Sequence, residues 1–418
     1  MKKGVAVIFV LLLAMAQGVS AGLNPEIDLD TELAGYVETR HCFQAKGPND
    51  CLASETLARL EGRASTEAFS LFTSVNLSAN HRFSEESGVS IHEAYVDYVS
   101  SSWDLRAGRQ IITWGNADGV RITDNISPSD MSEYITRDFD EIRMAVDALK
   151  IRMFGSHGTG ELIYLPFFKA GILPEDDSPW ALGGFSSTDT LTQSSGDAEP
   201  GRNLENGEIA VKYAFFLPGF DFALSYFYTW NDQPYYTFTH KTGEADDIYL
   251  VTPKFHRIHI AGLEFSRPHG DFVFRGEAGF LHGSRYSSRK KGIPLHKKDQ
   301  VKWLLGVDWY PGNNWSLLCQ VTGDRIFGYS DEIARDKQSA MATLNLSKKL
   351  LREKFTVSGM HYYDLDEGDS LTRFSGEYEL KDGFSLFIGS DIFKGDRAGD
   401  FGRYRDNTQV WAKVKYSF

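Results

Sequence analysis

The chain has 418 residues, a formal net charge of −13 at pH 7 and 13% aromatic residues. This acidic balance argues against a nucleic-acid partner, which calls for a basic surface. After the first residues, no apolar run approaches the roughly 20 residues that a membrane-spanning helix needs. A chain that crosses a bilayer with strands escapes such a test, because only every second residue of a strand faces lipid.

The amino terminus has the features of a secretory signal peptide. Lys2 and Lys3 precede an apolar run from Val5 to Met15, and small residues follow at Val19-Ser20-Ala21. The run is too short to span a bilayer, and a basic start with a small-residue cleavage site is typical of export. We expect cleavage after Ala21, so that residues 1–21 are the signal peptide and residues 22–418 form one exported domain.

Runs of alternating residues recur from Glu32 to the carboxy terminus. In the last run one face is apolar and carries Val410, Ala412, Val414, Tyr416 and Phe418. Such alternation is the signature of a strand with one apolar face. An aromatic terminal residue is typical of bacterial outer-membrane β-barrels, whose barrel assembly machinery reads this final strand. An edge strand of a soluble sheet is the alternative.

The connections between these runs alternate in length. Short turns such as Leu217-Pro218-Gly219 and Lys381 to Gly383 separate longer links such as Lys169 to Leu204. Outer-membrane barrels pair short periplasmic turns with long outer loops. An array of separate soluble domains would need linkers between the domains, and the sequence contains none. We predict an all-β fold: a transmembrane antiparallel up-and-down β-barrel of about 18 strands, with 16 as the alternative, in the bacterial outer membrane.

The segment Asn116 to Ile142 is the first candidate for function. Ser127-Pro128-Ser129-Asp130 has the form of a helix start, and Asp130 with Glu133 suits a capping box. We expect a short helical loop, residues 116–142, that folds into the lumen and narrows it. A loop that only covers the rim is the alternative.

Charged residues and a tryptophan cluster in and beside this segment. A charged constriction with an aromatic wall would sort solutes by charge and size. An ion-pair network that pins the loop to the barrel wall is the structural alternative, because charges inside barrels are common. The candidate residues of the constriction and solute path are Arg109, Trp114, Asp118, Arg121, Asp124, Asp130, Glu133 and Arg137.

The long outer loop, residues 169–204, mixes apolar and acidic side chains. Apolar residues in an exposed loop need a partner, so the loop is a candidate plug or hydrophobic ligand port; a loop packed on its neighbours is the alternative. Its acidic residues could bind calcium through their carboxylates, but no spacing enforces this, and we predict no metal site and no cofactor. The candidate port residues are Phe168, Lys169, Asp176, Asp177 and Trp180.

Three cysteines remain in the exported domain. Cys42 and Cys51 bracket a turn-rich segment, and export permits disulfides, so we predict a loop disulfide between them, with two free thiols as the alternative. Cys319 is in phase with Trp315, Leu317 and Val321. We expect it to be a small apolar residue that faces lipid.

Several stretches resemble an outer-membrane family catalogued as a domain of unknown function, DUF1302. They are HEAYVDY (His92 to Tyr98), DLRAGRQIITWGNADGVRITDNISPSD (Asp104 to Asp130), LPFFKAGILPEDDSPW (Leu165 to Trp180) and the ending GDRAGDFGRYRDNTQVWAKVKYSF. The family pattern has Asn-Pro-Arg-Asp where this chain has Ser127-Pro128-Ser129-Asp130, so an ion pair made by that arginine is not expected. The resemblance implies a barrel, and association with an inner-membrane exporter of the resistance-nodulation-division type and a periplasmic lipid-carrier-like protein. It supplies no substrate and no catalytic residues.

These observations favour an outer-membrane channel or transport component for a small or amphipathic solute. A plugged structural or interaction barrel that works with a periplasmic exporter system is the second hypothesis, and a hydrolase built on the loops is the third. The chain has no Gly-rich phosphate loop, nucleophile elbow or His-Glu metal helix, so we do not expect an enzyme. The basic segment His282 to Lys298 is a candidate site that binds lipopolysaccharide phosphates or attracts anions, and a solvated loop is the alternative. General contact with outer-membrane lipid is also expected.

Overall fold

The computed structural model describes residues 29–46, 50–175, 178–181, 190–193, 199–241, 248–289 and 296–418, with only the backbone described for residues 190–193, 238–241 and 248–251. The predicted signal peptide, residues 1–21, lies outside this range. Among the described residues, no helix is both long and apolar enough to cross a bilayer.

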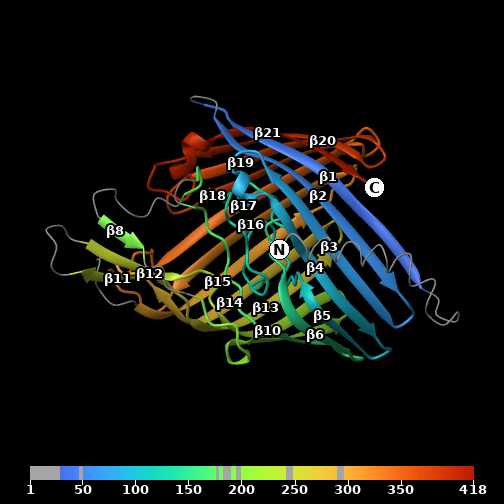
Figure 1. Ribbon diagram of the computed structural model, residues 1–418, viewed down its shortest axis with the longest axis horizontal. Coiled ribbons are helices and arrows are strands. Elements are labelled where there is room, and N and C mark those ends of the chain that lie inside the picture. Colours follow the sequence, from blue (N-terminus) through green and yellow to red (C-terminus); the bar gives the residue numbers. More distant parts are fainter. Residues whose placement is uncertain are drawn as a thin grey trace.

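Eighteen antiparallel strands form one closed barrel (Figure 1). Each strand pairs with the next, and the first strand, β1 (Asp30–Gln44), also pairs with the last, β21 (Gln409–Ser417). Beyond β21, Gly35 and Phe418 exchange backbone hydrogen bonds of 3.0 and 2.9 Å. The predicted all-β barrel with 18 strands is therefore confirmed.

The remaining barrel strands are β2 (Cys51–Ser65), β3 (Phe69–Asn80), β4 (Gly88–Val99), β5 (Trp103–Gln110), β6 (Val146–Phe154), β7 (Gly158–Leu165), β9 (Glu208–Leu217), β10 (Phe220–Trp230), β13 (Arg257–His269), β14 (Phe272–Tyr286), β15 (His296–Trp309), β16 (Trp315–Ile326), β17 (Gln338–Leu350), β18 (Phe355–Asp364), β19 (Ser370–Lys381) and β20 (Phe384–Lys394). A separate sheet contains β8 (Thr190–Gln193), β11 (Tyr235–Lys241) and β12 (Ile248–Lys254). Short 3-10 turns are η1 (Ser84–Glu86), η2 (Leu204–Asn206) and η3 (Gly402–Asn407).

Side chains alternate between an apolar exterior and a polar interior. On β21 the apolar face is exposed, as Val410 and Phe418 show at 48% and 52%, whereas Gln409 and Lys413 point inward and are buried. Every backbone group in hydrocarbon must be paired within the protein, and a closed barrel meets this need while its exterior contacts lipid. The exterior therefore suits a bilayer and the interior suits water.

The two ends of the barrel differ in their connections. The short turns lie at the end that contains the carboxy terminus, and Gly219 and Gly270 adopt φ angles of 66° and 59° there. Glycine suits these positions because a side chain disfavours positive φ. The long connections, including the sheet of β8, β11 and β12, lie at the opposite end (Figure 1). This is the polarity expected from the sequence.

The structure does not join Cys42 and Cys51, contrary to the predicted disulfide: both thiols are free. The strand register shifts beside Cys42, so that Cys42 lies opposite Ala53 whereas Cys51 lies opposite Phe43. The two cysteines are therefore not cross-strand partners, and Cys42 is buried at 1% exposure. Cys319 is exposed on the barrel exterior, as predicted.

The alternation of side chains between the two faces of the barrel predicts how β17 responds to an added charge. Leu344, in the middle of the strand, is 42% exposed on the exterior, and its neighbour Asn345 has the opposite orientation. Leu344→Arg should destabilise the folded barrel by about 2–4 kcal/mol, because it places a charge in hydrocarbon. The free energy of unfolding into denaturant from lipid vesicles measures the effect. Asn345→Arg is the matched control, and equal losses for both variants would contradict the assignment of the two faces.

Candidate functional site

The connection between β5 and β6, residues 111–145, lies inside the barrel and is called the lumen loop below (Figure 1). It bonds to strands on widely separated parts of the wall, among them β1, β14, β16, β19 and β21. The lumen loop therefore crosses the lumen instead of covering the rim.

The lumen loop contains no helix, contrary to the prediction for Asn116 to Ile142. The Asp130 carboxylate accepts a hydrogen bond from the backbone N–H of Ser132 at 3.0 Å, which forms a local turn. Ser129 and Asp130 also form isolated bridges to Arg143 and Ile172. An Asp side chain that bonds two residues ahead competes with helix formation, and the bridges hold this backbone extended.

Two wall residues hold the first half of the lumen loop. Glu277 on β14 accepts hydrogen bonds from the backbone N–H groups of Asn116 and Thr123 and from the Thr123 hydroxyl, the last at 2.8 Å. The Gln320 side chain on β16 both accepts from the Asp118 N–H at 3.2 Å and donates to its carbonyl at 2.8 Å. A loop without regular structure has unpaired backbone groups, and the wall pairs several of them here.

Asp118 is held by a cation of the wall. Arg275 on β14 donates to Asp118 at 2.9 Å and to Asp308 at 2.6 Å. The two carboxylates share one guanidinium, so this predicted constriction residue lies in a structural ion-pair network.

The second half of the lumen loop is held by cations of β19 and β21, another part of the wall. Arg373 on β19 donates to the Thr136 carbonyl at 2.8 Å and is paired with Asp391 at 3.0 Å. Lys413 on β21 lies 3.4 Å from Glu141. The last strand, β21, which closes the barrel, therefore also helps to hold the loop.

Glu133 makes a two-oxygen ion pair with the wall. Both of its carboxylate oxygens lie 2.6 Å from Arg40 Nη2 on β1. Burial favours the neutral acid, but Arg40 and Arg137 outweigh it and hold the pKa of Glu133 below its ordinary value. Arg137 also lies 3.4 Å from Asp130.

Trp114 is buried and connects the lumen loop to the wall. Its indole N–H donates to Glu161 on β7 at 2.6 Å, and its backbone N–H donates to Asp124 at 3.1 Å. Asp124 is in turn paired with Arg143 at 2.9 Å. Trp114 is 5% exposed and packs in a buried apolar cluster, so it supports the loop and does not face an open path.

Arg121 forms its hydrogen bonds mainly within the lumen loop. Its guanidinium donates to the carbonyls of Asp124 and Ser127, both at 2.6 Å, and to the Ser129 hydroxyl at 2.8 Å. Asp232, just after β10, lies 3.8 Å away. Arg121 nevertheless lines open space, because it borders both lumen cavities described below.

Arg109 lies on the opposite face of the wall from the other candidates. In the register of β5 it is opposite Asp147, to which it is ion-paired at 3.1 Å. The inward position is Arg106, which binds Asp97 at 2.7 Å. Because neighbouring residues of a strand point to opposite faces, Arg109 does not belong to the solute path that the sequence suggested.

The structure does not gather the candidate port residues into one pocket. Phe168 packs edge-on against Phe255, with ring centroids 4.9 Å apart, whereas Trp180 packs against Phe393 at 5.7 Å in a different cluster. Lys169 donates to the Ala145 carbonyl at 2.8 Å. The two aromatic residues are 8% and 2% exposed, which fits a loop packed on its neighbours. Asp176 and Asp177 lie outside the described residues.

Two cavities of about 350 and 300 Å³ border the lumen loop within the barrel. The residues that line both are Gly119, Val120, Arg121, Ile135, Lys302 and Tyr362. Among them, only Arg121 is a candidate residue from the sequence. The missed wall residue Lys302 carried one signal, since it alternates with the apolar Val301 and Trp303 and so had to point inward.

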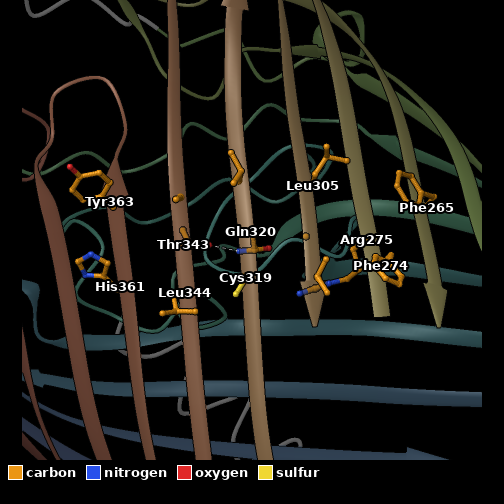
Figure 2. A pocket seen from close by; sticks show the side chains of 14 residues that line it. Phe265, Phe274, Arg275, Leu305, Cys319, Gln320, Thr343, Leu344, His361 and Tyr363 are labelled. Carbon is orange, nitrogen blue, oxygen red and sulfur yellow. Dashed lines mark hydrogen bonds between the residues drawn. The ribbon is translucent and has the colours of Figure 1, made fainter. Parts of the chain in front are cut away.

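A depression of about 620 Å³ is on the barrel exterior and is not part of the lumen. Figure 2 shows its apolar lining spread over neighbouring strands, including Leu305, Cys319 and Leu344. Gln320, behind this surface, bonds Thr343 at 2.9 Å on the lumen side. The depression faces lipid, so it is not the solute path. Within the described part of the chain, no group of three or more His, Cys, Asp or Glu residues is arranged to hold a metal ion.

Comparison with known proteins adds a family and a fold. A family model described as "Protein of unknown function (DUF1302)" matches residues 62–293, and no curated protein matches the chain. Among solved structures, Acinetobacter baumannii OccAB1 is 10% identical, with a TM-score of 0.56 over 93% of this chain and 96% of that one.

Two further solved structures are similar. Pseudomonas aeruginosa OccD3 (OpdP) is 8% identical, with a TM-score of 0.53 over 95% of this chain and 92% of that one. The outer membrane channel DcaP of Acinetobacter baumannii is 10% identical, with a TM-score of 0.47 over 95% and 100% of the two chains. At such identities the likeness concerns the fold alone.

The wall contacts of Glu277 predict how the lumen loop is held. Glu277→Ala leaves two backbone N–H groups and one hydroxyl without their acceptor, and an unsatisfied buried donor costs about 1–3 kcal/mol. Hydrogen exchange in residues 113–125 should become at least about tenfold faster, while the strands keep their protection. Glu61→Ala, on β2, is the control because Glu61 bonds only to Ser74 of the neighbouring strand. Unchanged exchange in Glu277→Ala would contradict the anchor.

The Glu133 ion pair predicts the response of the loop to acid. A carboxylate whose pKa is lower in the folded state stabilises that state above its unfolded pKa, and this contribution is lost as the pH falls through the folded pKa. Because the pKa of Glu133 lies below its ordinary 4.5, hydrogen-exchange protection of residues 131–136 should stay constant from about pH 7 to about pH 5 and fall only below pH 4.5. In Glu133→Gln this acid step should be absent. A step centred above about pH 5 in the unaltered protein would contradict the assignment.

Proposed function

The chain belongs to the DUF1302 family of proteins of unknown function, and we propose that it is an outer-membrane channel or transport component for a small or amphipathic solute. It is a porin-like β-barrel of the bacterial outer membrane. The observation that carries the proposal is the lumen loop, which narrows a wide barrel without filling it, because the two cavities remain beside it.

The width of the barrel supports passage of a solute. A barrel of eight strands is just filled by its own side chains, whereas barrels of 16–18 strands enclose an aqueous channel. This barrel has 18 strands, so a fully closed lumen would need more material than side chains supply. The lumen loop is that material, and it leaves space between itself and the wall.

The cavity linings support an amphipathic solute. Val120, Ile135 and Tyr362 present apolar surface, and Arg121 and Lys302 present positive charge, to both cavities. A site that combines apolar walls with a few placed polar groups is the usual form of a small-molecule site. A passage for ions alone would not need the apolar walls.

A plugged structural or interaction barrel, working with a periplasmic exporter system, is the second candidate. The bonds of the lumen loop to both sides of the wall favour it, because they oppose movement of the loop. An inner-membrane exporter and a periplasmic carrier would serve either function, since each would deliver or receive the solute at the periplasmic end. Lipopolysaccharide and the barrel assembly machinery remain proposed partners of the outer surface and of β21.

Conductance in planar lipid bilayers tests the proposed function. Replacement of residues 116–142 by a short Gly-Ser linker should raise single-channel conductance severalfold, because it removes the narrowest element of the path. Arg109→Ala is the control and should leave conductance unchanged, since Arg109 lies on the other face of β5. If the linker variant conducts no better than the unaltered protein, the lumen loop is not the constriction, and if neither conducts, the structural barrel is favoured.

A further inference from the structure

Lys302 on β15 is a lumen cation that its neighbours do not neutralise. The carboxylate next to it in the sheet register is Asp324 on β16. Asp324 is ion-paired with Arg335 and accepts hydrogen bonds from Gln300 at 2.8 Å and Ser339 at 3.2 Å. Among the residues that the structure describes, no carboxylate oxygen lies within 4.0 Å of the Lys302 ammonium.

Asp232 is the acid that lines the larger cavity, whereas Asp364 and Asp400 line the smaller one beside Asp324. Asp232 lies 3.8 Å from Arg121, whose own donors are taken up by the lumen loop. Burial raises the pKa of Asp232 to about 6, against the effect of Arg121. One carboxylate carries at most one negative charge and this one lies nearer to Arg121, so it cannot compensate both cations.

An apolar surface begins beside this cation. The larger cavity, of about 350 Å³, falls in the range of about 300–1,000 Å³ that is usual for small-molecule sites. Its other cations are already bound, Arg137 by Asp130 and Arg373 by Asp391. Besides Val120 and Tyr362, its apolar lining includes residues of the lumen loop and the outer loop: Met131, Ile135, Phe139, Ile142, Ile172 and Leu173.

We propose that the two lumen cavities form one binding site for an aliphatic carboxylate, whose single anionic head pairs with Lys302 while its chain lies on the apolar lining. One unmatched cation in a cavity that also presents apolar side chains fits an amphiphile with one charge at one end. A carboxylate supplies the counter-charge that the wall lacks, and the chain covers apolar surface that would otherwise contact water. This site names the solute class of the proposed function and rests on it for the role of the lumen as a path.

Photolabelling of the full-length barrel in lipid nanodiscs tests the site. The probe is a dodecanoate analogue with a diazirine at the end of its chain, and labelled peptides are identified by mass spectrometry. Label should appear in residues 131–142 or at Ile172 and Leu173, and free dodecanoate should compete with it, whereas dodecyltrimethylammonium should not. Lys302→Gln should weaken binding by about tenfold or more, the usual scale for one charged hydrogen bond, and Lys302→Arg should retain it.

Lys150→Gln is the matched control, because Lys150 is an inward lysine of β6 that lines neither cavity. Migration of unheated samples in gels verifies that each variant is folded. Equal labelling of the unaltered protein and Lys302→Gln, or equal competition by the cationic amphiphile, would overturn the proposal. Conductance of the same preparations separates the two proposals: site-specific labelling in a barrel that carries no current would support the site and reject the channel.

Discussion

Backbone hydrogen bonding between the first and last strands is the constraint on which the rest of the molecule depends. In hydrocarbon no water replaces a missing partner, so an open sheet edge is not tolerated. Residues Tyr36–Gln44 pair with Gln409–Ser417, and the terminal Phe418 continues the pairing to Gly35. A side chain at Gly35 would place its Cβ 2.4 Å from the Arg59 carbonyl oxygen and 3.0 Å from the Phe418 ring. The absence of a side chain at Gly35 therefore leaves room for the Phe418 ring where the first and last strands pair.

Closure with this number of strands creates a lumen too wide for wall side chains to fill. The lumen loop occupies part of that space. The loop and the wall supply each other with partners: Arg40 and Lys413 of the wall face Glu133 and Glu141 of the loop, and Glu277 of the wall accepts backbone N–H groups of the loop. Burial of an unpaired charge is costly, so these pairs make an interior rich in charges compatible with a stable fold. Lys302 is notable because the same scheme leaves it without such a partner.

The sequence was sufficient for the fold because alternation is a local property. The apolar face of β21, from Val410 to Phe418, could be read directly, and strand number and polarity followed from the turns between such runs. The site was less predictable because its partners are far apart along the chain. Arg109 is near Arg121 in the sequence, but the alternation of side chains along β5 places it on the outer face. Asp130 had the form of a helix cap, but bridges to distant residues fixed its backbone otherwise.

In the proposed channel, the anchoring of the lumen loop would also determine where a solute passes. Each hydrogen bond contributes about 0.5–1.5 kcal/mol net, and more when one group is charged, so release of the whole loop would require simultaneous loss of its bonds to β1, β14, β16, β19 and β21. Such a concerted step is costly compared with passage alongside a fixed loop. The cavities that share Arg121, Lys302 and Tyr362 lie between loop and wall. If the proposed channel function holds, the side chains that face this gap would set its selectivity, whereas the buried ion pairs would only hold the loop in place.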